Sequence, residues 1–435
     1  MKEKLVVVGN GMAGMRTVEE LLKIAPDKYD ISVFGSEPYG NYNRILLSPV
    51  LCGEKTIDEI MLNDLQWYED NNITLYKGAK VTHIDRKACV VTADDGTTAK
   101  YSRLLLATGS DPFIIPVPGH KLPGVISFRD IHDVNVMLHT AETKHKAVVI
   151  GGGLLGLEAA NGLIKQGMDV TVVHLMDTLM ERQMDEVSGA MLKQSLEDKG
   201  MKFLMKASTE SILGDTHVSG IRFADGTELE TDLVVMAVGI RPNISLAKEI
   251  GLHCERGIVV NDTLQTFDPK IYSIGECVQH RGLTYGLVAP LFEMAKVCAN
   301  HLAEYGIGLY QGSVTSTKLK VTGIELFSAG DFQGDDTTDD IVVRDAGRGV
   351  YKKIVIKDNI IVGAVLYGDA IDGAWYFQLM REQTNISDIR DQLMFGKAHL
   401  GDSGHGGDVV ADMSDDTEIC GCNGVCKGDV VKAIT

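Results

Sequence analysis

The sequence predicts an α/β protein with two interleaved Rossmann-like units, a small C-terminal α/β domain and a short cysteine-rich tail. Three observations lead to this prediction. An apolar strand followed by a glycine-rich turn and a helical pattern occurs twice, as KLVVV before Gly9 and as AVVIGGGLLG from residue 147. After about residue 310 the pattern changes to strands joined by turns. Near the C-terminal end lies EICGCNGVCKG, with three closely spaced cysteines.

Composition limits the classes of function. A chain of 435 residues is longer than a single hydrophobic core normally supports, so we expect several domains. Its 44% hydrophobic and 23% charged residues are typical of a soluble globular protein. No apolar run approaches the roughly 18 residues of a membrane span. The net charge of −18 disfavours nucleic acid and anionic membranes as partners. Met1 to Val8 lack the pattern of a secretory signal, so we expect a cytoplasmic protein.

The first glycine fingerprint is Gly9, Gly11 and Gly14, in GxGxxG spacing directly after the first strand. This spacing permits a tight turn, a close backbone approach to a pyrophosphate, and packing of helix on strand. Glu37 follows the second strand, DISVFGSE, where a carboxylate can accept hydrogen bonds from both ribose hydroxyls. We therefore expect FAD at this copy.

The second fingerprint is Gly151, Gly153 and Gly156, with VTVVHL as the following strand. His174 stands where a carboxylate would accept the 2′-hydroxyl of NADH, and it is interpreted either as a cofactor contact or as a surface histidine. Near the position that the 2′-phosphate of NADPH would take, the negative charges of Asp177 and Glu181 outnumber the single positive charge of Arg182. NADH is therefore favoured, with NADPH as the alternative.

The remaining elements follow in order. A Pro-rich crossing over 112–123 and the strand 232–239 carry the chain out of the first unit and back into it. A strand and glycine turn at 271–277 and a helix over 286–305 complete that unit. KKIVIKDNIIVGAVLYG predicts a hairpin that turns at Asp358 and Asn359. The predicted units are the FAD domain at 1–112 and 240–308, the NAD(P) domain at 113–239, an interface domain at 309–395, a linker at 396–417, and a tail module at 418–435.

The tail cysteines suggest a ligand set. Cys420 and Cys422 form a CxC pair, and Cys426 follows four residues later, a pattern that suits an iron–sulfur cluster or zinc. Four ligands are normally needed, so either a fourth lies elsewhere, or the chain stops before a second pair, or the thiols are free. Cys52 could be a redox nucleophile near a flavin, although we favour a buried structural cysteine.

Seven segments in this order resemble the large subunits of NAD(P)H-dependent assimilatory nitrite reductases: GNGMAG, NYNRILLSPVL, LLLATGS, GGGLLGLEAA, AVGIRPN, IYSIGEC and CGCNGVCKG. The first six are shared with two-dinucleotide-domain flavoprotein reductases in general. The resemblance implies FAD contacts at Gly9, Gly11, Gly14, Glu37, Arg44, Ser48, Thr108, Gly109, Arg129, Gly275 and Glu276. It implies NAD(P)H contacts at Gly151, Gly153, Gly156, Glu158 and Gly239, to which the strand-end position adds His174. No catalytic residue is assigned, with Glu158 and Cys52 as candidates.

The resemblance also implies a [2Fe-2S] module that begins at Cys420 and Cys422 and is incomplete in this chain. Pro49 stands where ferredoxin and rubredoxin reductases usually carry a lysine near the flavin. The main hypothesis is an electron-entry unit that passes electrons from NADH through FAD towards an iron–sulfur and sirohaem centre or an acceptor protein. The alternatives are a stand-alone NADH reductase of rubredoxin, ferredoxin or oxygen, and an FAD-binding redox sensor. A homodimer is a further option for its assembly.

Overall fold

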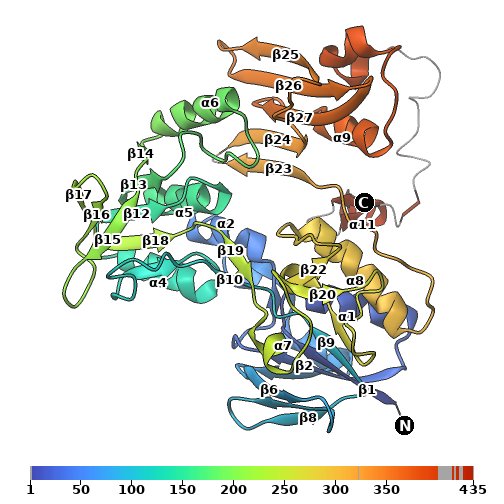
Figure 1. Ribbon diagram of the computed structural model, residues 1–435. Coiled ribbons are helices and arrows are strands. Elements are labelled where there is room, and N and C mark those ends of the chain that lie inside the picture. The colour runs from blue at the N-terminus through green and yellow to red at the C-terminus, as the bar shows by residue number, and fades with distance from the viewer. Residues whose placement is uncertain (1, 322, 400–413, 416–417, 421–424, 435) are drawn as a thin grey trace.

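The computed structural model describes residues 2–321, 323–399, 414–415, 418–420 and 425–434. Two parallel sheets form the lower and middle parts of the molecule, and an antiparallel sheet forms the upper part (Figure 1). The predicted α/β class with two Rossmann-like sheets and a smaller C-terminal sheet is confirmed. The domain boundaries within the chain remain predictions.

The first parallel sheet has the strand order β21-β9-β1-β2-β5. Its strands are β1 (Glu3–Val8), β2 (Tyr29–Gly35), β5 (Thr74–Lys77), β9 (Arg103–Leu106) and β21 (Ile271–Ser273). β1 is apolar almost throughout because a parallel sheet is covered on both faces. Helix α1 (Met12–Ile24) has an apolar residue every three positions at Met12, Met15, Val18 and Leu21, and this buried stripe packs towards the core. Helix α8 (Val288–Leu302) lies against α1.

Shorter elements surround this sheet. They are β3 (Asn41–Tyr42), η1 (Arg44–Leu46), α2 (Leu47–Leu51), η2 (Asp58–Ile60), β4 (Met61–Asn63), α3 (Leu65–Asp70), β6 (Val81–Asp85), β7 (Val90–Ala93), β8 (Thr98–Lys100), α7 (Ser245–Glu249), β20 (Ile258–Val260), η3 (Gly275–Cys277) and β22 (Val278–His280). Strands β6, β7 and β8 form an antiparallel sheet of their own.

The second parallel sheet has the order β11-β18-β12-β13-β14. Its strands are β11 (Val125–Ser127), β12 (Lys146–Ile150), β13 (Asp169–His174), β14 (Lys202–Met205) and β18 (Leu233–Met236). Its helices are α4 (Ile131–Ala141), α5 (Leu154–Lys165) and α6 (Glu186–Glu197). An antiparallel sheet of β15 (Thr209–Leu213), β16 (Gly220–Phe223) and β17 (Glu228–Glu230) is attached.

Two crossing segments join the parallel sheets. They are β10 (Ser110–Pro112) and β19 (Ile240–Pro242), which pair antiparallel. The guanidinium of Arg241 lies 3.9 Å from the ring centroid of Phe113 beside this pair. The outgoing and returning crossings therefore hold each other between the two units.

The C-terminal domain is a five-stranded antiparallel sheet with α9 (Gly373–Arg381) beside it. Its strands are β23 (Ser316–Val321), β24 (Ile324–Gly330), β25 (Asp339–Asp345), β26 (Val350–Lys357) and β27 (Ile360–Tyr367). The predicted hairpin is confirmed, because Asp358 and Asn359 both have positive φ, at 51° and 56°, between β26 and β27. The Tyr351 hydroxyl donates to Asp185 Oδ2 at 2.6 Å, which ties this sheet to the start of α6.

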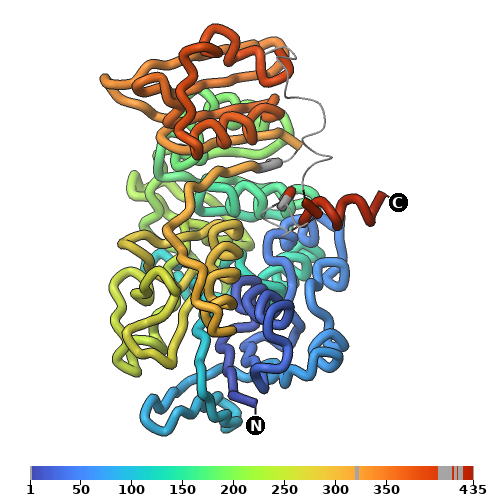
Figure 2. The backbone as a smooth tube through the Cα atoms, turned by 90° about the vertical axis from the view of Figure 1, so that its right-hand side faces the viewer, coloured from blue at the N-terminus to red at the C-terminus, as the bar shows by residue number. Residues whose placement is uncertain are grey.

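The last described segments are short. η4 (Arg390–Phe395) and η5 (Lys397–His399) extend into the start of the predicted linker, and most of the rest of that linker lies outside the described residues. β28 (Glu418–Cys420), β29 (Val425–Cys426) and α11 (Lys427–Ile434) follow, with α11 at the side of the molecule in Figure 2. None of the helices in the described residues has the length and hydrophobicity that a bilayer span requires.

Candidate functional site: two glycine cradles that meet at Ser48 and Glu158

The first glycine fingerprint is closely packed on one side and open on the other. Gly9 has φ +115°, and a Cβ there would lie 2.1 Å from the Ala107 carbonyl oxygen. A Cβ at Gly14 would lie 2.7 Å from the Gly9 carbonyl oxygen. At Gly11, the residue before α1, a Cβ would meet nothing within 4 Å. The cradle thus presents backbone and the N-terminus of α1 to open space, which fits a dinucleotide pyrophosphate.

Glu37 follows β2 at the carboxyl edge of the same sheet. The Tyr42 hydroxyl donates to Glu37 Oε2 at 2.7 Å, and Arg44 forms an ion pair with the same carboxylate. Arg44 also donates to the Arg129 carbonyl oxygen at 3.1 Å. Glu37 and Arg44 are therefore brought together, and Arg44 reaches from the first unit to the second.

Arg129 and Glu276 form an ion pair although 147 residues separate them in sequence. The Ser110 hydroxyl donates to Glu276 Oε2 at 2.7 Å and accepts from Arg129 Nη2 at 2.9 Å. Ser110 thus bridges two predicted FAD contacts, and the sequence motifs did not single it out. Its position directly after Thr108 and Gly109 was the available signal.

Thr108 and Gly109 lie where the first crossing leaves β9. The Thr108 hydroxyl donates to the Asn243 carbonyl oxygen at 2.7 Å, and the Asn243 N–H donates to the Gly109 carbonyl oxygen at 2.9 Å. Gly275 begins η3 with φ +87°, and a Cβ there would lie 3.1 Å from Ala13 Cβ in α1. These residues therefore surround the first cradle.

The second fingerprint repeats the geometry of the first. A Cβ at Gly151 would lie 2.2 Å from the Ala237 carbonyl oxygen, and one at Gly156 would lie 1.9 Å from the Gly151 carbonyl oxygen. At Gly153, before α5, a Cβ would again meet nothing within 4 Å. Gly239, with φ +108°, also faces open space. The second cradle is thus equally able to accept a pyrophosphate.

His174 ends β13 and is buried, with 7% of its surface exposed. The alternative that it is a surface histidine is therefore wrong, because the chain after β13 folds back over the imidazole. The Gly152 N–H donates to His174 Nδ1 at 3.0 Å, and Nε2 lies 3.0 Å from the Thr178 carbonyl oxygen and 3.3 Å from Glu181 Oε2. The predicted cofactor contact at His174 remains a prediction.

The two units touch through a partly buried polar contact. The Ser48 hydroxyl, in α2, donates to Glu158 Oε2, in α5, at 2.6 Å. Burial raises the pKa of the Glu158 carboxyl, and the hydrogen bond from Ser48 opposes this shift. Ser48 was predicted at the FAD site and Glu158 at the NAD(P)H site, and the structure brings the two side chains together.

Cys52 lies one helical turn after Ser48 and is half-buried. Asn161 Nδ2 donates to its sulfur at 3.5 Å. Burial raises the pKa of the Cys52 thiol, so the thiolate needed for a redox nucleophile is disfavoured. This environment is the one we expect of a structural cysteine.

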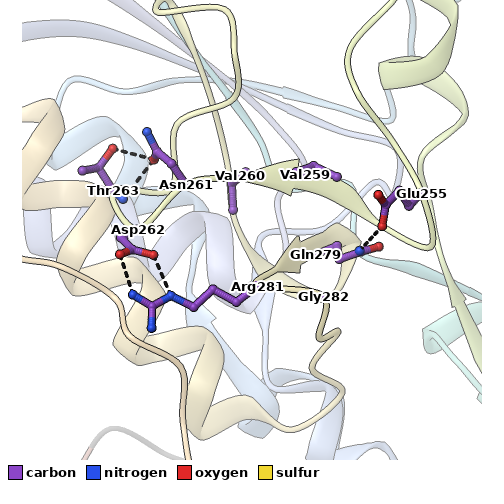
Figure 3. A pocket seen from close by; sticks show the side chains of 9 residues that line it. All are labelled: Glu255, Val259, Val260, Asn261, Asp262, Thr263, Gln279, Arg281 and Gly282. Atoms are coloured by element: carbon purple, nitrogen blue, oxygen red, sulfur yellow. Dashed lines mark hydrogen bonds and ion pairs between the residues drawn. The ribbon is translucent and has the colours of Figure 1, made fainter.

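A separate hollow lies beside β20 and β22 (Figure 3). Asp262 and Arg281 face each other across it in a bidentate pair, with Nη2 to Oδ2 at 2.7 Å and Nε to Oδ1 at 3.0 Å. Hydrogen bonds from Arg281 and His280 lower the pKa of Asp262 to about 2. Because Asp262 and Arg281 already neutralise each other in this ion pair, we assign no ligand to the hollow.

The predicted metal ligands fall largely outside the described residues. Cys422 is not described, and only the backbone of Cys420 is described, in β28, where it pairs with Val425. The Cys426 N–H donates to Asp429 Oδ2 at 2.9 Å. Within the described ranges there is no group of three or more His, Cys, Asp or Glu side chains able to hold a metal.

Comparisons with known proteins place this geometry in context. Residues 3–300 match the family model described as pyridine nucleotide-disulphide oxidoreductase, and residues 316–384 match the rubredoxin NAD+ reductase C-terminal domain. A nitrite reductase [NAD(P)H] of Bacillus subtilis is 51% identical over 100% of this chain and 53% of its own length. An assimilatory nitrate reductase electron transfer subunit of the same organism is 44% identical over 100% of this chain and 55% of its own length. The chain thus spans about half the length of these curated relatives.

Among solved structures, the NADH:rubredoxin oxidoreductase of Clostridium acetobutylicum matches with a TM-score of 0.76 and 26% identity. The match covers 91% of this chain and 100% of that one. The sheet arrangement described above is therefore found in a solved reductase over nearly the whole chain.

Proposed function

The chain belongs to the pyridine nucleotide-disulphide oxidoreductase family, and from this membership we propose that it is the electron-entry part of a nitrite reductase. NADH bound at the second cradle would pass a hydride to FAD bound at the first, and electrons would then leave towards an iron–sulfur and sirohaem region of a larger protein. A bound FAD supplies the exchange between paired and single electrons. Family membership supports both FAD and NAD(P)H as cofactors, and the preference for NADH is part of the proposal.

The observation that carries this proposal is the contact between Ser48 and Glu158. Glu158 lies in α5 directly after the second cradle, and Ser48 lies in α2, which follows the Glu37–Arg44 cluster of the first. Their 2.6 Å hydrogen bond supports the proposal that nucleotides held by the two cradles approach each other near these side chains. Hydride transfer needs such an approach, because the reacting atoms must come within about 3–3.5 Å.

In this proposal the residues divide into two groups. FAD is held by Gly9, Gly11, Gly14, Glu37, Arg44, Ser48, Thr108, Gly109, Arg129, Gly275 and Glu276. The nicotinamide nucleotide is held by Gly151, Gly153, Gly156, Glu158 and Gly239. His174 lies at the adenosine end, where its hydrogen bond with the Gly152 N–H supports the glycine loop. We add Ser110 to the first group because it bridges Arg129 and Glu276.

Nitrite is proposed as the final acceptor because relatives named for nitrite reduction match the whole chain and continue beyond it. Cys420 and Cys422, with Cys426 as a weaker candidate, are proposed as ligands of a [2Fe-2S] cluster. We also propose a cytoplasmic location, with a homodimer as the assembly to test.

A second candidate function is a stand-alone NADH reductase of rubredoxin, ferredoxin or oxygen. The match of residues 316–384 to a rubredoxin reductase C-terminal domain favours it. The structural likeness to a complete NADH:rubredoxin oxidoreductase also favours it.

A comparison of electron acceptors, each supplied separately, distinguishes the two candidate functions. The FAD-loaded chain and the longest native protein that contains it should be supplied with NADH and, separately, with ferricyanide, rubredoxin or nitrite. The proposal predicts ferricyanide reduction by both proteins and nitrite consumption by the longer protein alone. Rapid rubredoxin reduction by the chain, with no nitrite consumption by the longer protein, would favour the second candidate.

A further inference from the structure

The adenosine end of the second cradle lacks the carboxylate that usually ends the second strand. In dinucleotide folds an acidic side chain there accepts the ribose 2′-hydroxyl of NAD and repels the 2′-phosphate of NADP. Here β13 ends at His174. Some other group must therefore distinguish the two nucleotides.

His174 has no polar atom left for a ribose. The Gly152 N–H donates to Nδ1 at 3.0 Å, so Nδ1 is unprotonated and the ring proton sits on Nε2. Nε2–H faces the Thr178 carbonyl oxygen at 3.0 Å and Glu181 Oε2 at 3.3 Å. A Cβ at residue 152 would lie 2.8 Å from His174 Cγ, so the ring presses directly on the glycine loop. His174 is thus a positioning residue between the loop and the segment after β13.

That segment is also fixed by its own backbone. The Met180 N–H donates to the Gly152 carbonyl oxygen at 3.0 Å. Met180 is buried and has φ +53°, a left-handed conformation that a residue other than glycine rarely adopts. Strained backbone of this kind persists where the surrounding structure fixes it, often at ligand sites. The result is a fixed position for Glu181, the next residue.

The Glu181 side chain is 36% exposed and lies at the carboxyl end of β13. One of its oxygens faces His174, and in the described part of the chain no second polar partner contacts this carboxylate. Lys206, which could otherwise attract a phosphate, lies 3.4 Å from Asp177. Arg182, the neighbouring residue, is exposed. The carboxylate is therefore free to accept a ribose hydroxyl, with Arg182 as the competing cation.

We propose that Glu181 is the specificity-determining residue of the second cradle. Its carboxylate takes the role of the missing strand-end acid, accepts the ribose 2′-hydroxyl of NADH and repels the 2′-phosphate of NADPH. His174 positions it through the hydrogen bonds to Gly152 and Thr178. This inference rests on the proposed function of the second cradle as a nicotinamide nucleotide site.

The test uses ligands that cannot react. ADP-ribose and 2′-phospho-ADP-ribose differ only in the 2′-phosphate and carry no nicotinamide, so their binding to the FAD-loaded chain reports recognition without turnover. The proteins are the wild type, Glu181→Gln, and Glu210→Gln as the matched control. Glu210 is an exposed carboxylate on β15 in the same predicted unit, so its variant removes the same charge elsewhere.

We expect the wild type to bind ADP-ribose more tightly than its 2′-phosphorylated form. Glu181→Gln should reduce this preference about tenfold, because the amide no longer repels the phosphate. Glu210→Gln should leave it within about twofold. A matching fall in the ratio of kcat/KM for NADH over NADPH should accompany the change.

Three other results would overturn the inference, and they can be told apart. If both ligands bind and Glu181→Gln leaves the preference unchanged, or if the wild type prefers the 2′-phosphate through Arg182, Glu181 is not the determinant and the proposed function stands. If neither ligand binds the wild type, the second cradle is not a nucleotide site and the proposed function fails with the inference.

Discussion

Gly11→Val tests the assignment of the first cradle to FAD. Gly11 has φ −88° and ψ 177°, which valine adopts without strain, and a Cβ there meets no protein atom within 4 Å. The apo fold should therefore lose no more than about 1 kcal/mol, the typical effect of changing a helix N-cap. A bound pyrophosphate would have to occupy the same space as the new side chain. We expect FAD affinity to fall at least about 100-fold, which corresponds to roughly 2.7 kcal/mol.

The chain supplies two matched controls. Gly153 has the same backbone conformation in the second cradle and the same open surroundings, so Gly153→Val should keep FAD but lose binding of NADH. Gly14→Val should instead destabilise the fold by about 1–3 kcal/mol, because its Cβ would lie 2.7 Å from a carbonyl oxygen.

The assay combines flavin content and stability. The flavin-to-protein ratio after purification and a titration of apo-protein with FAD give the affinity, and thermal unfolding of the apo-proteins gives the stability. A Gly11→Val protein that is yellow and saturated with FAD would refute the reasoning. So would a Gly153→Val protein that loses FAD while Gly11→Val retains it.

Three further predictions concern the contacts around the site. Burial raises the pKa of the Glu158 carboxyl, so the ionised carboxylate destabilises the fold at high pH. Glu158→Gln should therefore raise the free energy of unfolding at about pH 8. This gain should shrink as the pH falls towards about 4.3, the ordinary pKa of a glutamate. A gain independent of pH in urea titrations would contradict this. Tyr351→Phe removes the 2.6 Å hydrogen bond to Asp185 and should cost about 1–2 kcal/mol in urea unfolding, and an unchanged midpoint would count against it. Cys52→Ser should retain most NADH–ferricyanide turnover because burial keeps the thiol protonated, and a loss beyond about tenfold would restore the nucleophile hypothesis.

The sequence predicted those elements whose conformation is determined by residues close together in the chain. The two glycine cradles could be predicted from the GxGxxG spacing, because the last glycine of each fingerprint packs against the first within the same strand–turn–helix unit. The contacts of Gly9 with Ala107 and of Gly151 with Ala237 form only in the folded protein. The hairpin at Asp358 and Asn359 follows from residues that tolerate positive φ.

What the sequence could not predict depends on contacts between distant segments. A histidine at the end of a strand is expected to be exposed, yet the chain that follows β13 covers His174. The bridge that Ser110 makes between Arg129 and Glu276 joins three segments that meet only in the folded protein. The Ser48–Glu158 contact spans 110 residues and likewise has no local signal.

The central claim is that NADH reduces a flavin held by this chain. Its most direct test is an anaerobic titration of the purified, FAD-loaded chain with NADH while the absorption spectrum is recorded. NADH should bleach the flavin band at about 450 nm, with roughly one NADH consumed per flavin. A chain that binds no flavin, or a flavin band that neither NADH nor NADPH bleaches, would contradict it.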